Sequence, residues 1–219
     1  MGDRVRQIKL AILASTISKG PTSDYSSWLE IKEGRGSSCC NYVTNEVKLS
    51  DIATYNSGQN GYVLNTDTTL LEYQTLTIPF GDILLMPVAS PPFILTNRGK
   101  ITINGALLSE GKIVNSGTMI NNGTLNHVGG RFTNTGFVAN KDGGLFGIGA
   151  PLYNTGTITN TDPSTIFITS NVYNYGGGVI NTYSGGIVGP GNLYNPVTNT
   201  GCGIGTLVGV TSTGIDCPP

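Results

Sequence analysis

The stretch Ile113-Val114-Asn115-Ser116-Gly117 decides the fold, because variants of it recur through the second half of the 219-residue chain. Each variant has an apolar residue, a variable residue, asparagine, any residue and usually glycine. The asparagines are 18, 19, 20, 20 and 21 residues apart, and they are Asn97, Asn115, Asn134, Asn154, Asn174 and Asn195. A period near twenty residues indicates a solenoid of stacked coils.

Two further apolar series have the same period. One contains Ile101, Met119, Val138 and Ile158, and the other contains Leu107, Leu125, Leu145, Ile166, Ile187 and Leu207. Three apolar positions per period indicate three short strands per coil, each bounded by glycine or asparagine. We therefore expect an all-β protein, a single-stranded right-handed parallel β-helix with about 18–21 residues per coil.

The repeated asparagines are interpreted as structural. Equivalent asparagines in successive coils can form a ladder of side-chain hydrogen bonds, although a role as ligands for sugar or metal stays open. The glycines are expected to supply the positive φ angles of tight corners.

Composition and the phase of the repeat together suggest three segments. Residues 1–93 carry 16 of the 25 charged residues, and residues 94–219 carry 25 of the 32 glycines. Ile78 lies 19 residues before Asn97, in phase with the repeat, so we place the solenoid at 70–201. Residues 1–69 are then a mixed N-terminal attachment arm or cap, and 202–219 a C-terminal cap in which Cys202 and Cys217 could form a disulfide.

Composition excludes several classes of protein. Charged residues make up 11% of the chain and the net charge is −1, which argues against a nucleic-acid surface of clustered Lys and Arg. Hydrophobic residues make up 38%, too many for a disordered chain. No run of eighteen apolar residues occurs, so no membrane span is expected.

Catalytic, metal and cofactor signatures are not evident in the sequence. Asp142 and Asp162 are twenty residues apart and could form an acid–base pair on one face, but both lie in turn-like sequences. His127, the single histidine, is expected at the surface in a turn. There is no phosphate-binding loop, zinc spacing or dinucleotide fingerprint. We therefore expect no enzyme activity and no cofactor.

Tyr153, Tyr173 and Tyr194 occupy one repeat position, directly before an asparagine of the series. They should form an aromatic stripe on the outside of the solenoid. Three roles stay open for this stripe: packing between coils, a protein interface or glycan binding. Trp28, the single tryptophan, is a further candidate interface residue.

The strings Asn115-Ser116-Gly117-Thr118, Asn121-Asn122-Gly123-Thr124 and Asn154-Thr155-Gly156-Thr157 resemble those of Asn-Gly-Thr repeat proteins. Such β-helical repeats occur in large DNA viruses of protists and in bacterial surface adhesins. The resemblance implies a structural or surface component.

We therefore expect a virion component such as a minor capsid, vertex or spike protein. Its partners would be other structural proteins and copies of itself, in a trimer for instance. The alternative is an extracellular adhesin or glycan-binding module.

Overall fold

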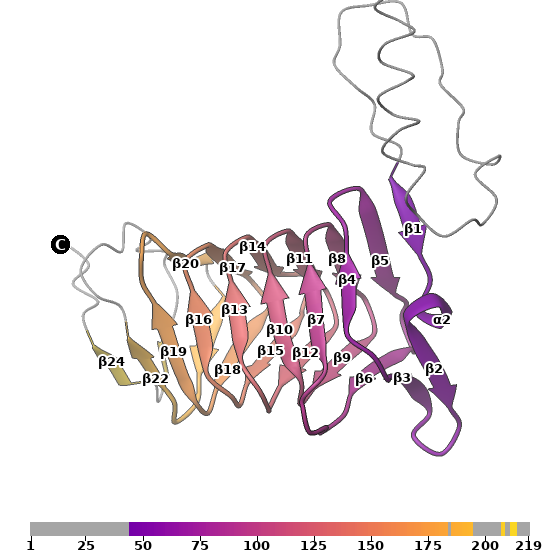
Figure 1. Cartoon of the computed structure of the whole chain (residues 1–219). Helices are drawn as coiled ribbons and strands as arrows, with labels where there is room; N and C mark the ends of the chain where they lie inside the picture. The colour runs from indigo at the N-terminus through magenta and orange to yellow at the C-terminus, as the bar shows by residue number, and fades with distance from the viewer. Residues whose placement is uncertain (1–43, 184, 195–206, 209–210, 214–219) are drawn as a thin grey trace, which may run out of the picture. The chain divides into compact units, whose positions relative to one another are not determined.

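The computed structural model describes residues 44–183, 185–194, 207–208 and 211–213 (Figure 1). The chain divides into two units, residues 1–43 and 44–219, and every described residue belongs to the second. In this unit, parallel strands stack coil upon coil into three sheets. The predicted parallel β-helix with three strands per coil is thereby confirmed.

Each coil contributes one strand to each of three sheets, named A, B and C. Sheet A contains β1 (Asn45–Val47), β5 (Gln74–Ile78), β8 (Lys100–Ile103), β11 (Thr118–Asn121), β14 (Phe137–Asn140), β17 (Thr157–Thr161) and β20 (Val179–Tyr183). Sheet B contains β2 (Ala53–Asn56), β3 (Gly61–Leu64), β6 (Ile83–Met86), β9 (Ala106–Ser109), β12 (Thr124–His127), β15 (Leu145–Ile148), β18 (Thr165–Ile168), β21 (Gly186–Val188) and β23 (Leu207–Val208). Sheet C contains β4 (Thr68–Leu70), β7 (Ile94–Asn97), β10 (Lys112–Asn115), β13 (Phe132–Asn134), β16 (Leu152–Asn154), β19 (Asn171–Asn174), β22 (Asn192–Tyr194) and β24 (Thr211–Thr213).

Most strands of the central coils have four residues, of which the second and fourth point inward. In β10, Ile113 and Asn115 are buried while Lys112 and Val114 are half-buried on the outer face. This alternation follows from the two-residue period of a strand. The second residues of the strands form the apolar core, and the fourth residues lie beside the corners, where many of them are polar.

The strand register corrects two expectations. Phe146, rather than Leu145, is the partner of Leu125 and lies fully buried, whereas the side chain of Leu145 is 43% exposed. Ile78, which the sequence placed in phase with Asn97, instead pairs with Ile103 in sheet A. The residue of the preceding coil that pairs with Asn97 in sheet C is Leu70. Adjacent apolar residues make the inward residue ambiguous from sequence spacing alone.

The sheets contain strands before residue 70, where the sequence places the start of the solenoid. β1 pairs in parallel with β5, and β3 pairs in parallel with β6. β2 and β3 form an antiparallel hairpin, and one helical turn, α2 (Leu49–Ile52), precedes it. Residues 45–70 therefore supply strands to all three sheets.

Four of the repeated glycines, Gly99, Gly117, Gly136 and Gly156, are required by close packing, and the expectation of positive φ is wrong for them, whereas Gly176 has the expected positive φ of 58°. A Cβ atom built on Gly117 would overlap the carbonyl oxygen of Gly99 in the preceding coil, and one on Gly136 would overlap that of Gly117. Positive φ also occurs at glycines outside the repeated position, such as Gly143 (φ 86°). The corner of each coil thus lies directly against the backbone of the coil before it.

Replacing Gly117 by alanine should therefore destabilise the solenoid. The expected loss in the free energy of unfolding is about 2–3 kcal/mol, because the added methyl group forces two coils apart. Gly186→Ala is the control, since a Cβ there meets only Val188 Cγ1 at 4.0 Å. Urea unfolding should show a large loss for Gly117→Ala alone, and equal losses would contradict the packing argument.

Candidate functional site

An asparagine ladder runs along the inner side of sheet C. The Nδ2 group of each asparagine donates to Oδ1 of the next: Asn97 to Asn115 at 2.7 Å, Asn115 to Asn134 at 2.7 Å, Asn134 to Asn154 at 2.6 Å and Asn154 to Asn174 at 2.6 Å. All five side chains are buried. The amides are therefore used in bonds between coils and are not presented to a ligand.

A second asparagine ladder lies at the end of the sheet A strands, where the sequence analysis did not expect one. Asn121 donates to Asn140 at 2.6 Å, and Asn140 donates to Asn160 at 2.7 Å. The same amides also donate to a backbone carbonyl of the sheet B strand in the next coil, for example Asn121 Nδ2 to the carbonyl oxygen of Leu145 in β15 at 2.9 Å. The spacing of 19 and 20 residues between these asparagines was the available signal.

Each ladder begins where an apolar residue occupies the preceding coil. Leu70 precedes Asn97, and Ile103 precedes Asn121. The Oδ1 atoms of Asn97 and Asn121 are consequently buried without a hydrogen-bond partner. Because an unsatisfied buried acceptor is costly, the ladders become favourable only through their continuation over several coils.

Asn134→Ala should lower the free energy of unfolding by about 3 kcal/mol. The substitution removes the donor to Asn154 Oδ1 and the acceptor for Asn115 Nδ2, both of which are buried in the core. Thr133→Ala is the control. Thr133 is the neighbouring residue on the outer face of β13, and its loss should change stability by about 0.5 kcal/mol. Urea unfolding of both variants tests this, and similar losses would contradict a special role of the ladder.

The tyrosine stripe forms on the outer face of sheet C as predicted. The rings of Tyr153 and Tyr173 stack with centroids 4.9 Å apart, and those of Tyr173 and Tyr194 stack at 5.1 Å. These spacings match the strand separation of about 4.8 Å, so the coil spacing itself places the rings in stacking contact. The Arg131 guanidinium lies over Tyr153 at 4.2 Å, a cation–π contact.

This stacking limits what the tyrosine stripe can bind. Both faces of the Tyr173 ring are covered by neighbouring tyrosines, and one face of Tyr153 is covered by Tyr173 and the other by Arg131. A sugar that stacks on a ring face of Tyr153 or Tyr173 would have to displace one of these groups. The geometry therefore favours packing between coils, while the ring edges remain available for protein contacts.

Tyr173→Ala should lower the unfolding free energy by about 2 kcal/mol, because it removes two stacked pairs. Tyr173→Phe should lose far less, since it keeps both pairs and removes only the bond from Asn171 Nδ2 to the hydroxyl, at 3.1 Å. Tyr183→Ala is the control, because that side chain is 53% exposed and outside the stripe. Thermal unfolding compares the three, and a loss as large for Tyr183→Ala would contradict this account.

His127 is buried, and the expectation of a surface turn is wrong. It is the last residue of β12, points inward and is fully buried. Its Nδ1 atom lies 3.4 Å from Ser109 Oγ, its ring packs edge-on against Phe132, and Nε2 has no hydrogen-bond partner. Burial lowers the pKa of His127 from 6.5 to about 4. The side chain is thus a neutral core residue.

The buried imidazole makes stability depend on pH. Because the folded pKa lies below the unfolded value, the unfolded chain binds the proton more readily between pH 6.5 and 4. Stability should therefore fall by about 3 kcal/mol as pH falls through this range. His127→Leu should lack this component, and Asn126→Ala, on the outer face of β12, should retain it. Urea unfolding at several pH values measures the difference, and identical pH profiles for wild type and His127→Leu would contradict it.

Asp142 and Asp162 lie in turns, as expected. Both are exposed in the corner between sheets A and B, one coil apart. The carboxylate of Asp142 forms an ion pair with Lys141 at 3.1 Å. Acid–base cleavage of a sugar needs two carboxyl groups that face one bound substrate. Asp142 and Asp162 lie in exposed turns, and the described residues form no cleft around them.

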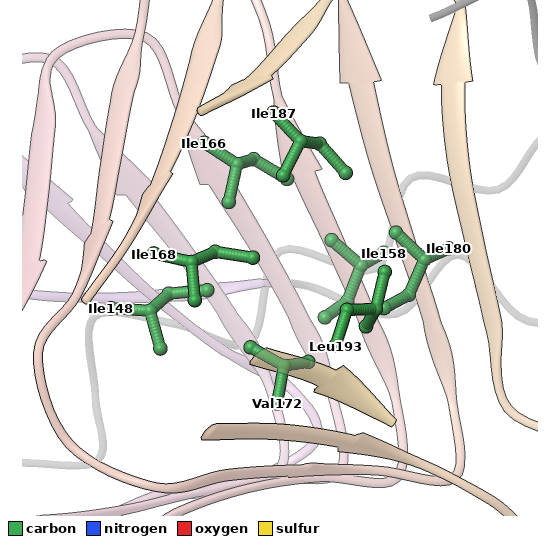
Figure 2. Close-up of a pocket in the computed structure, with 8 residues that line it drawn as sticks. All are labelled: Ile148, Ile158, Ile166, Ile168, Val172, Ile180, Ile187 and Leu193. Atoms are coloured by element: carbon green, nitrogen blue, oxygen red, sulfur yellow. The ribbon is translucent and has the colours of Figure 1, made fainter. Parts of the chain in front are cut away.

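A small apolar cavity lies inside the last described coils. Its volume is about 10 Å³ and eight aliphatic side chains line it, among them Ile158, Ile166 and Val172. Figure 2 shows these side chains inside the coils. A volume of about 10 Å³ is barely enough for one water molecule, and the aliphatic lining offers a water no hydrogen-bond partner. We therefore interpret the cavity as a packing defect and not as a ligand site.

Several predicted residues lie outside the described part of the chain, namely Asn195, Trp28, Cys202 and Cys217. The described residues contain no group of three or more His, Cys, Asp or Glu that could hold a metal ion. Within the same ranges, no helix has the length and apolar character needed to cross a membrane. Comparison of the chain with protein-family models, curated proteins and solved structures gave no match.

Proposed function

We propose that this chain is a non-enzymatic structural component of a larger assembly. The observation that carries the proposal is the weakly charged, partly apolar outer surface of the described coils. From Gly143 onward, the only charged residues in the sequence are Asp162 and Asp216, while Leu145, Phe167, Tyr175 and Tyr183 are exposed by 39–53%. A surface of this kind is poorly suited to stand free in water and is typical of contact with other proteins.

The interior supports a structural role in a second way. The inward amides of Asn115, Asn134, Asn140 and Asn154 bond to other coils, and His127 is a buried neutral group. The polar residues inside the solenoid thus serve coil stacking. The parallel strands give a regular scaffold, and fold by itself does not specify a reaction.

A virion is the assembly we propose, with this chain as a minor capsid, vertex or spike protein. The resemblance of the repeats to Asn-Gly-Thr proteins of large DNA viruses supports this choice. An extracellular adhesin is the competing role. The covered ring faces of Tyr153 and Tyr173 argue against stacking of a glycan on these two residues.

Crosslinking mass spectrometry on the intact source particle or cell tests the proposal. The described lysines Lys48, Lys100, Lys112 and Lys141 provide attachment points on the solenoid, and Lys9, Lys19 and Lys32 provide them in the N-terminal unit. The purified chain, treated identically, is the control for links within and between copies. Links to a shell or capsid protein are expected. A free secreted protein without such neighbours, retained on a glycan array, would overturn the proposal in favour of an adhesin.

A further inference from the structure

We propose that the tyrosine stripe is a site of oxidative coupling, at which neighbouring rings are joined as dityrosine and successive coils become covalently linked. The stripe consists of Tyr153 in β16, Tyr173 in β19 and Tyr194 in β22. The oxidant is hydrogen peroxide acting through a haem peroxidase, which removes electrons from phenols one at a time. This inference goes beyond the assembly role proposed above and does not depend on it.

The register of sheet C aligns the three rings. Tyr153 pairs with Tyr173, and Tyr173 pairs with Tyr194, in parallel strands that lie side by side (Figure 1). The ring planes are inclined by only 17° and 10°, and the ring centroids are 4.9 and 5.1 Å apart. The ring carbons beside the hydroxyl groups therefore lie next to one another in adjacent rings. Reacting groups held in this way couple as if in a unimolecular reaction.

The rings can be reached by an oxidant and have the freedom to react. All three side chains are half-buried on the outer face of sheet C, so a part of each ring is open to solvent. Rotation about the bond from Cβ to the ring is broad in tyrosine, and it tips the edges of adjacent rings together. The Tyr173 hydroxyl accepts a hydrogen bond from Asn171 Nδ2 at 3.1 Å and donates to no acceptor within the described ranges. Its proton can therefore pass to solvent.

The coupling reaction balances with two phenols and one molecule of hydrogen peroxide. Each phenol loses one electron and its hydroxyl proton and becomes a phenoxyl radical. The two radicals form one carbon–carbon bond between the positions beside the oxygens, and the hydrogen on each of these carbons then moves to the oxygen, which restores both phenols. The two electrons and two protons reduce the peroxide to two water molecules. The product is lighter than the original chain by two hydrogen atoms.

The crosslinks would reinforce a part of the core that contains a cavity. Val172 and Leu193, the inward residues directly before Tyr173 and Tyr194, both line the small apolar cavity. Tyr153 and Tyr173 are twenty residues apart, and Tyr173 and Tyr194 are twenty-one apart, so each dityrosine closes a loop of one coil. Closing a loop restricts the unfolded chain, as a disulfide does. The linked coils should therefore resist unfolding more strongly.

Peptide mapping of the peroxidase-treated, full-length chain by mass spectrometry tests the inference. The purified chain is treated at low protein concentration with hydrogen peroxide and a haem peroxidase, and the monomer is isolated under denaturing conditions. Thermolysin, which cleaves beside apolar residues, then separates the three tyrosines. Trypsin would leave them in one peptide, because the sequence has no Lys or Arg beyond Lys141.

Two variants accompany the wild type. Tyr173→Phe keeps an aromatic ring in the stack and removes the phenol that both pairs share. Tyr62→Phe is the matched control, because Tyr62 is half-buried like Tyr173 and contacts another tyrosine, Tyr55, edge-on with centroids 5.4 Å apart. Far-UV circular dichroism confirms that both variants fold.

In the wild type, links from Tyr173 to Tyr153 or Tyr194 are expected to exceed links from Tyr173 to Tyr175 or Tyr183 at least about tenfold, because stacking and not sequence proximity selects the partner. Tyr62→Phe should retain these links. Tyr173→Phe should form no link between Tyr153 and Tyr194, which lie two strand spacings, about 9.6 Å, apart. The linked wild type should unfold at a temperature at least about 5 °C higher than the untreated chain.

Three results would overturn the inference. The first is a wild type in which Tyr173 is linked mainly to Tyr175 or Tyr183, or is not linked at all. The second is coupling of the stripe tyrosines only between separate chains, which would appear as dimers in place of linked monomers. The third is a linked monomer that unfolds at the same temperature as the untreated chain. The first result is measured on the wild type alone, so it does not depend on the folding of either variant.

Discussion

The stacking distance between coils is the constraint on which the rest of the structure depends. Neighbouring strands of a sheet must lie about 4.8 Å apart for their backbone groups to bond. At the corners this distance leaves no space for a Cβ atom between Gly117 and the carbonyl of Gly99. Inside the corners it is short enough for one asparagine amide to bond the next, and outside it brings the tyrosine rings into stacking contact. Glycine, asparagine and tyrosine therefore recur in the sequence for the same geometric reason.

The asparagine period was sufficient to predict the fold, the sheet C ladder and the position of the tyrosine stripe. These features depend on residues that repeat in identical form, so spacing alone locates them. The sequence did not show which of Leu145 and Phe146 points into the core, because both are apolar and the turn at Asp142-Gly143 lengthens the coil before them. The position of His127 was missed because its neighbours in the row are Ser109 and Ile148, and no repeat marks that corner.

The inner and outer surfaces of the solenoid have separate roles in this account. Hydrogen bonds between coils occupy the ladder asparagines, and burial keeps His127 neutral. The outer faces differ from one another: β5 and β17 of sheet A present threonines, β16, β19 and β22 of sheet C present stacked tyrosines, and β6 of sheet B presents Ile83 and Leu85. These differences between the outer faces are compatible with the proposed role, in which different faces contact different neighbours.

Hydrogen exchange of the asparagine side-chain amides, measured by nuclear magnetic resonance, tests the central claim most directly. The Nδ2 hydrogens of Asn115, Asn134 and Asn140 are buried and bonded between coils, whereas Asn56, at the end of β2, is exposed. The account predicts that the three ladder amides exchange orders of magnitude more slowly than that of Asn56, and that they become unprotected together when the coils unfold. Exchange of the ladder amides as rapid as that of Asn56 would contradict it.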